Sequence, residues 1–152
     1  MSISGEIAFA GADEAQPQPA FLAALADEDL RAVVICPSNP FISIDPILSL
    51  PGVCEALRAC AAPVIAVSPI IGGKAVKGPT AKMMAELGLP VDAAAVAGHY
   101  GDILDLHVAD ETDAEEVGDL GVPVIFARAL MQSLEDREAL ARVVLEAADR
   151  GF

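Results

Sequence analysis

Tryptophan is absent from the 152-residue sequence, and phenylalanine and tyrosine together supply only six residues. Basic residues are also scarce, since nine Lys and Arg face 23 Asp and Glu, which gives a formal net charge of −14. Binding to a nucleic-acid backbone needs a broad basic surface. This composition therefore excludes DNA and RNA as expected partners.

Long apolar runs and targeting signals are missing as well. The longest apolar runs, such as 64–67, are far too short to cross a bilayer, and no basic amphipathic helix is visible. The first residues, MSISGEIAF, lack the positive and apolar regions of a signal peptide. Cys36, Cys54 and Cys60 are odd in number and form no CxxC pair, which is typical of reduced thiols in the core of a cytoplasmic protein. We therefore expect a cytoplasmic protein with no membrane partner.

What the sequence does have is aliphatic residues. Hydrophobic residues make up 54% of the chain, mostly Ala, Val, Leu and Ile, and the length is sufficient for one domain with a real core. Small aliphatic side chains suit parallel strands that are covered by Ala-rich helices.

Strand and helix patterns alternate along the chain. Continuous apolar runs at 32–36, 64–67, 104–109 and 123–127 predict strands buried on both faces, and 5–9 predicts a weaker edge strand. Helical patterns fall at 19–29, 51–61, 78–88, 91–103, 113–121 and 133–151. This order predicts a Rossmann-like α/β fold over residues 1–152, with a mostly parallel sheet, helices on both faces and a single three-layer domain.

The loop after the strand at 32–36 reads PSNPFISIDPILSLPG. Its candidate binding residues are Pro37, Ser38, Asn39, Pro40 and Ser43. Prolines fix the backbone, while Ser and Asn place donors and acceptors at set positions. The same residues are common in plain connecting turns, so that interpretation stays open.

The loop after the strand at 64–67 reads SPIIGGKAVKGPTAKMM and holds all three lysines of the chain. Glycines let a backbone approach a ligand closely, lysines supply charged donors, and a helix opening at the end of the loop favours anions. We expect a phosphate cradle here, although the loop is neither a Walker A motif nor a GxGxxG motif. A solvated loop with surface lysines is the alternative. The candidate residues are Ser68, Gly72, Gly73, Lys74, Lys77, Gly78 and Thr80.

We identify no candidate catalytic residue in the sequence. His99 and His107 lack a third ligand in register, which argues against zinc, and no Ser-His-Asp grouping is evident. We therefore predict no metal ligand in this chain. Because the two candidate loops follow successive parallel strands, they should lie together at one edge of the sheet and bind a phosphorylated ligand.

At these loops the sequence resembles the 2-phospho-L-lactate transferase (CofD) family. PSNPFISIDPIL and SPIIGGKAVKGPTAKMM look like its two signature blocks, and LGLPVDAAAVAGHYGDILD and ARALMQSLEDREALARVVLE resemble its later segments. The resemblance implies transfer of a phospholactyl or phosphoenolpyruvyl group from a guanosine diphosphate ester to the deazaflavin Fo, with release of GMP, in coenzyme F-420 biosynthesis. It also implies Mg as a cofactor.

The chain departs from this family in length and at one position. Family members are about twice as long, and the Gly-rich half expected to hold Mg and Fo has no match here, so the resemblance covers a C-terminal half. Asp45 stands where the family often has glycine, which adds negative charge near the expected phosphate site. We expect a fragment, a remnant or one subunit of a split enzyme, which pairs with a complementing chain or forms a homo-oligomer. A non-catalytic module that binds a nucleotide or UDP-sugar is the alternative.

Overall fold

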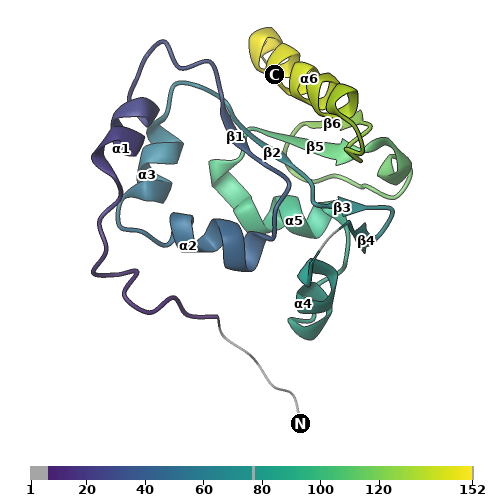
Figure 1. Ribbon diagram of the computed structural model, residues 1–152, viewed down its shortest axis with the longest axis horizontal. Coiled ribbons are helices and arrows are strands. Elements are labelled where there is room, and N and C mark those ends of the chain that lie inside the picture. Colours follow the sequence, from purple (N-terminus) through teal and green to yellow (C-terminus); the bar gives the residue numbers. More distant parts are fainter. Residues whose placement is uncertain (1–6, 77, 152) are drawn as a thin grey trace.

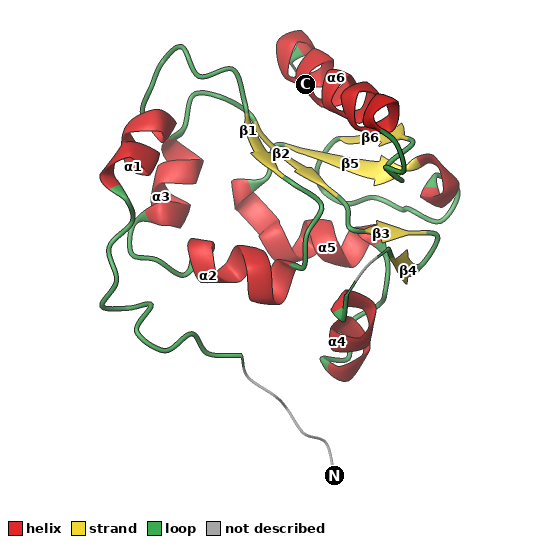
Figure 2. Cartoon of the chain, viewed as in Figure 1, coloured by secondary structure: helices red, strands yellow, loops and turns green. Residues whose placement is uncertain are grey.

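A computed structural model describes residues 7–76 and 78–151. Its centre is a parallel four-stranded sheet with the strand order β1-β2-β5-β6 (Figures 1 and 2). The strands are β1 (Val33–Ile35), β2 (Val64–Val67), β5 (Leu106–Asp110) and β6 (Val124–Ala127). All three pairings are parallel, as the continuous apolar runs predicted.

Helices cover the sheet on both faces, which confirms the three-layer prediction (Figure 1). Helix α6 packs on one face, where Leu140 and Val144 meet Ile65 and Val108. The other face is covered by helices from the first two thirds of the chain. The helices are α1 (Pro19–Leu25), α2 (Asp45–Leu48), α3 (Val53–Ala59), α4 (Thr80–Glu86), α5 (Ala93–Tyr100) and α6 (Leu134–Arg150).

Short helical turns flank several elements. A π-helical turn (Pro40–Ile44) precedes α2, and 3₁₀ turns at Gly101–Ile103 and Glu111–Asp113 lie before and after β5. The helix predicted over 113–121 is wrong, because only the 3₁₀ turn forms there and the following residues are turn or irregular. Gly118 and Gly121 disfavour a helix in that segment. The edge strand predicted over 5–9 is absent from residues 7–9, and residues 5 and 6 lie outside the described part.

A small hairpin interrupts the loop after β2, which the sequence patterns did not predict. Strands β3 (Ile70–Ile71) and β4 (Lys74–Ala75) pair antiparallel, and Ile71 lies opposite Lys74. Gly72 and Gly73 form the two-residue turn between them, with φ of 55° and 68°. A tight hairpin turn of this kind requires positive φ at both positions, which glycine adopts without strain.

In the described ranges, no individual helix has both the length and the apolar character needed to cross a membrane. The segments Pro40–Leu48 and Val53–Ala59 meet that criterion only as a pair, and a bend of 83° separates them.

Candidate functional site

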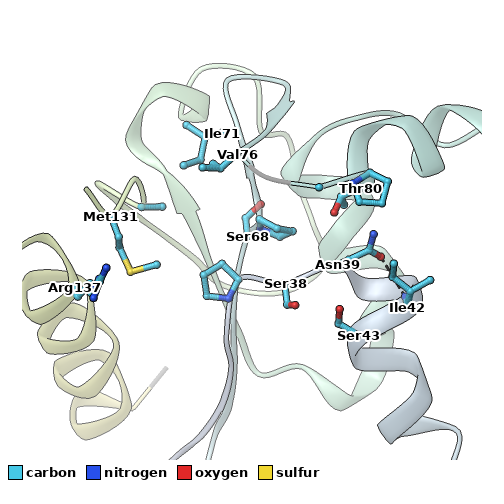
Figure 3. Close-up of a pocket in the computed structure, with 15 residues that line it drawn as sticks. Ser38, Asn39, Ile42, Ser43, Ser68, Ile71, Val76, Thr80, Met131 and Arg137 are labelled. Carbon is cyan, nitrogen blue, oxygen red and sulfur yellow. Dashed lines mark hydrogen bonds between the residues drawn. The ribbon is translucent and has the colours of Figure 1, made fainter. Parts of the chain in front are cut away.

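A pocket of about 460 Å³ lies where the loops that follow β1, β2 and β6 meet (Figure 3). These loops leave the carboxyl ends of parallel strands, which is where open α/β sheets usually bind ligands. The pocket is lined by Pro37, Ser38, Asn39, Ile42, Ser43, Ser68, Pro69, Ile71, Val76, Gly78, Pro79, Thr80, Ala129, Met131 and Arg137. The two loops that the sequence singled out are therefore neighbours, as predicted.

The loop after β1 forms the first wall. Asn39 caps the turn that begins at Pro40, because its Oδ1 accepts hydrogen bonds from the Phe41 amide at 2.9 Å and the Ile42 amide at 3.2 Å. The Asn39 carboxamide oxygen is thus engaged within its own loop. This capped turn sets the positions of Ile42 and Ser43 on the wall (Figure 3).

The loop after β2 forms the second wall, and its first polar side chain is also engaged internally. The Ser68 hydroxyl donates to the Ile70 carbonyl and accepts from the Ile70 amide, both at 3.1 Å. Farther along, Gly78 and Thr80 bring the start of α4 to the pocket. Since Asn39 and Ser68 are engaged, the hydroxyls of Ser38, Ser43 and Thr80 remain as donors for a ligand.

The segment between β6 and α6 forms the third wall. Buried Asp110, at the end of β5, holds this segment, because its Oδ2 accepts from the Ala129 amide at 2.8 Å. Its Oδ1 accepts from the Thr112 amide at 3.0 Å and the Thr112 hydroxyl at 2.6 Å. Burial tends to raise the pKa of Asp110, but the hydrogen bonds from Thr112 and Ala129 outweigh it and lower that pKa. An ionised carboxylate therefore fixes the wall that carries Met131 and Arg137.

The charge of the pocket differs from that of the whole protein. No Asp or Glu among the described residues lines the pocket, although the formal net charge is −14. Among the described lining residues, Arg137 alone carries a full charge. A cavity without carboxylates and with one guanidinium favours an anionic ligand, because a carboxylate in the wall would repel one.

The structure brings seven of the twelve predicted binding residues to this pocket. They are Pro37, Ser38, Asn39, Ser43, Ser68, Gly78 and Thr80. Pro40 is buried at the first position of the π-helical turn, behind the wall. Gly72, Gly73 and Lys74 belong to the β3–β4 hairpin and do not line the pocket, because antiparallel pairing turns the chain there. Lys77 lies outside the described residues.

The glycine turn of the hairpin faces a buried carboxylate instead. Burial is the main influence on Asp113 and raises its pKa, while the amides of Gly72 and Gly73 oppose that rise. The Asp113 Oδ2 atom itself has no hydrogen-bond partner among the described residues. The backbone that we expected to cradle a phosphate therefore lies near a buried acidic side chain.

The third wall was not predicted from the sequence. Ala129, Met131 and Arg137 follow β6, the last strand of the sheet. The rule that ligands bind beyond the carboxyl ends of parallel strands applies to this loop as well, and it would have pointed to them. The prediction was confined to the two earlier loops, because their residue patterns resemble ligand-binding loops.

The pocket carries no ready metal site. Within residues 7–76 and 78–151, no three or more His, Cys, Asp or Glu side chains gather closely enough to hold a metal ion. No Asp, Glu or His of the described residues lines the pocket, so the pocket wall itself does not fit magnesium.

The fold and the pocket together define a Rossmann-like α/β protein with a ligand site at the carboxyl edge of its sheet. The model of the family described as "2-phospho-L-lactate transferase CofD" matches residues 3–128. The chain therefore belongs to the CofD family, as its sequence blocks indicated.

Curated relatives support this assignment. The chain is 40% identical to a phosphoenolpyruvate transferase of Kitasatospora aureofaciens, and the match covers 92% of this chain and 44% of that protein. It is 44% identical to a 2-phospho-L-lactate transferase of Methanosarcina barkeri, with coverage of 89% and 43%. The corresponding protein of Methanosarcina mazei is 43% identical, with coverage of 90% and 45%. The chain thus spans less than half the length of these relatives.

Proposed function

We propose that this chain supplies the donor-binding part of a CofD-type transferase. In the proposed reaction, a 2-phospho-L-lactyl or phosphoenolpyruvyl group passes from a guanosine diphosphate ester to the deazaflavin Fo, and GMP is released. The observation that carries this proposal is a pocket at the carboxyl edge of the sheet whose described lining holds one arginine and no carboxylate, in a protein of net charge −14. The relatives, named phosphoenolpyruvate transferase and 2-phospho-L-lactate transferase, support the same reaction class.

The chemistry that such a pocket serves is a phosphoryl transfer. A ribityl hydroxyl oxygen of Fo would bond to the phosphorus that carries the lactyl or enolpyruvyl group, while the bond from that phosphorus to GMP breaks and the hydroxyl proton is lost. Catalysis of this kind rests mainly on positioning and on neutralising charge. The hydroxyls of Ser38, Ser43 and Thr80 and the Arg137 guanidinium would supply those two functions on the donor's phosphates.

The proposal also includes a second polypeptide. The chain covers 43–45% of three relatives that have the proposed type of activity, and we assign the Mg ligands and the Fo site to the part that it does not span. Val34 on the edge strand β1 and Phe126 on the opposite edge strand β6 are 40% and 39% exposed. Such apolar side chains favour association with a complementing chain or with another copy.

A non-catalytic module that binds a nucleotide or a UDP-sugar is the second candidate. One observation favours it: no Asp, Glu or His lines the pocket among the described residues, so the pocket itself offers no general base. This candidate predicts tight ligand binding without group transfer.

Calorimetric titration tests the proposed site. GDP, the nucleotide part of the donor, is titrated into the purified chain, into Ser43→Trp and into the control Ser49→Trp. Ser43 lines the pocket, while Ser49, in the same segment, lies outside it and donates to the Pro46 carbonyl at 3.1 Å. We expect GDP to bind the wild type and Ser49→Trp with equal affinity, and Ser43→Trp to bind about tenfold or more weakly.

Two results would count against this assignment. Equal binding of GDP by all three proteins would show that GDP does not bind in this pocket. Binding of UDP-glucose with no binding of GDP would replace the transferase proposal by the second candidate.

A further inference from the structure

Arg137 and Arg142 are the two arginines that form no ion pair among the described residues, and of these two only Arg137 lines the pocket. Four of the six arginines form ion pairs, which are Arg31–Asp149, Arg58–Asp102, Arg128–Asp136 and Arg150–Glu146. Arg142, on the same helix as Arg137, lies between Glu138 and Glu146 at a spacing of four residues each way. The positions four residues before and after Arg137 are Ser133 and Ala141, which carry no charge.

The backbone that carries Arg137 is held firmly. Ser133 and Asp136 form a capping box at the start of α6, with the Asp136 amide donating to the Ser133 hydroxyl at 3.2 Å. Asp136 Oδ2 also accepts from the Gln132 amide at 2.9 Å and the Ser133 amide at 3.1 Å. Arg137 therefore starts from a fixed position, and its side chain retains the freedom to meet a ligand.

Arg137 also lies on the side of the pocket opposite the wall formed by the loop after β1. It lies on the α6 side together with Met131, while Asn39, Ile42 and Ser43 lie on the opposite side (Figure 3). A ligand between these walls would have hydroxyl donors on one side and a guanidinium on the other. The guanidinium is a planar fork that binds phosphate or carboxylate oxygens in pairs, which a lysine does not do.

We infer that Arg137 is the specificity-determining residue by which this pocket recognises the anionic group of its ligand, a phosphate or carboxylate of a nucleotide diphosphate ester. This inference rests on the proposed function, because it assigns a role within the same pocket. The family model ends at residue 128, so its match does not extend to Arg137.

The test compares Arg137→Gln and Arg137→Lys with the matched control Arg142→Gln, which removes the same charge from the same helix outside the pocket. GDP is titrated into each protein at about 0.05 M and about 0.5 M KCl, since added salt screens exposed charge. We expect Arg137→Gln to bind GDP about tenfold to a hundredfold more weakly at low salt, with a smaller salt dependence than the wild type. Arg137→Lys should recover part of the affinity, and Arg142→Gln should match the wild type.

Thermal unfolding of each variant shows whether Arg137 acts only by stabilising the fold. Arg137 is exposed, so its variants should unfold at the wild-type temperature. If Arg137→Gln binds GDP as tightly as Arg142→Gln does, the role of Arg137 is refuted. If Ser43→Trp has lost binding in the same experiment, the pocket is still supported as the GDP site. If Arg137→Gln loses affinity and thermal stability together, the specificity role is also refuted. If the wild type binds no GDP, both the proposed function and this inference fail.

Discussion

We predict that the buried His107 lowers the free energy of unfolding of the protein in mild acid. Its side chain is fully buried, and its position on β5 pairs with Ala66 on β2 and with Val124 on β6. Neither ring nitrogen has a hydrogen-bond partner among the described residues. Burial therefore lowers the pKa of His107 from its ordinary value of 6.5 to about 4.

The sign of the effect follows from proton uptake. Between pH 6.5 and pH 4 the unfolded chain protonates this imidazole while the folded chain keeps it neutral, so protons favour unfolding as the pH falls. A difference of about 2.5 pKa units corresponds to about 3 kcal/mol when fully developed, and to about 2 kcal/mol at pH 5. This contribution to stability is present above pH 6.5 and is lost as the pH falls toward 4.

Urea unfolding of the wild type and His107→Leu from about pH 8 to about pH 5 measures this contribution. Leucine has a similar volume and no polar atom, so the variant should be more stable at pH 8 by about 1–3 kcal/mol, the cost of a buried polar group without a partner. The difference in free energy of unfolding between the variant and the wild type should increase by about 2 kcal/mol more at pH 5. His99→Gln is the control, because His99 contacts Asp45 near the surface at 2.8 Å. If the difference between His107→Leu and the wild type is the same at every pH, the argument from burial is wrong.

Two further predictions concern Asp110 and the exposed apolar side chains. Asp110→Asn should lower the free energy of unfolding by about 1–3 kcal/mol in urea titrations, since an amide places a donor against the Ala129 and Thr112 amides. The exposed Asp119→Asn should change it by less than about 0.5 kcal/mol, and equal losses in both variants would refute the role of Asp110. The isolated chain should self-associate in light scattering, and less so after Val34→Thr and Phe126→Thr; a monodisperse wild-type monomer would contradict this.

The sheet could be predicted from the sequence because its strands are buried on both faces. Residues 64–67 form a continuous apolar run, and β2 occupies that run with all four residues buried. The alternation with helices then led to the parallel topology and to the edge where the pocket lies. Helix α6 was equally predictable, since Ser133 begins it and Gly151 follows it as its capping residues.

The roles of individual polar residues were harder to predict, because helix capping and ligand binding use the same side chains. Asn39 and Ser68 line the pocket as expected, yet both make their hydrogen bonds within their own loops. The third wall depends on the long-range bond from the Ala129 amide to Asp110, nineteen residues away, which no local pattern reports. Arg137 enters the site through that tertiary contact.

The hairpin after β2 shows how an internal group can account for a motif that resembles a ligand site. Two consecutive glycines with positive φ present backbone amides on one side, which is also how a backbone binds an anion. Here the amides of Gly72 and Gly73 lie near the buried Asp113 side chain, and antiparallel pairing gives the turn its own structural requirement for glycine. Lys74 then lies on an exposed strand of a strongly acidic protein, where a cation needs no ligand to be favourable. Among the described residues that line the pocket, Arg137 is the cation, and this is why we assign the recognition of the ligand's charge to Arg137 rather than to Lys74 of the hairpin.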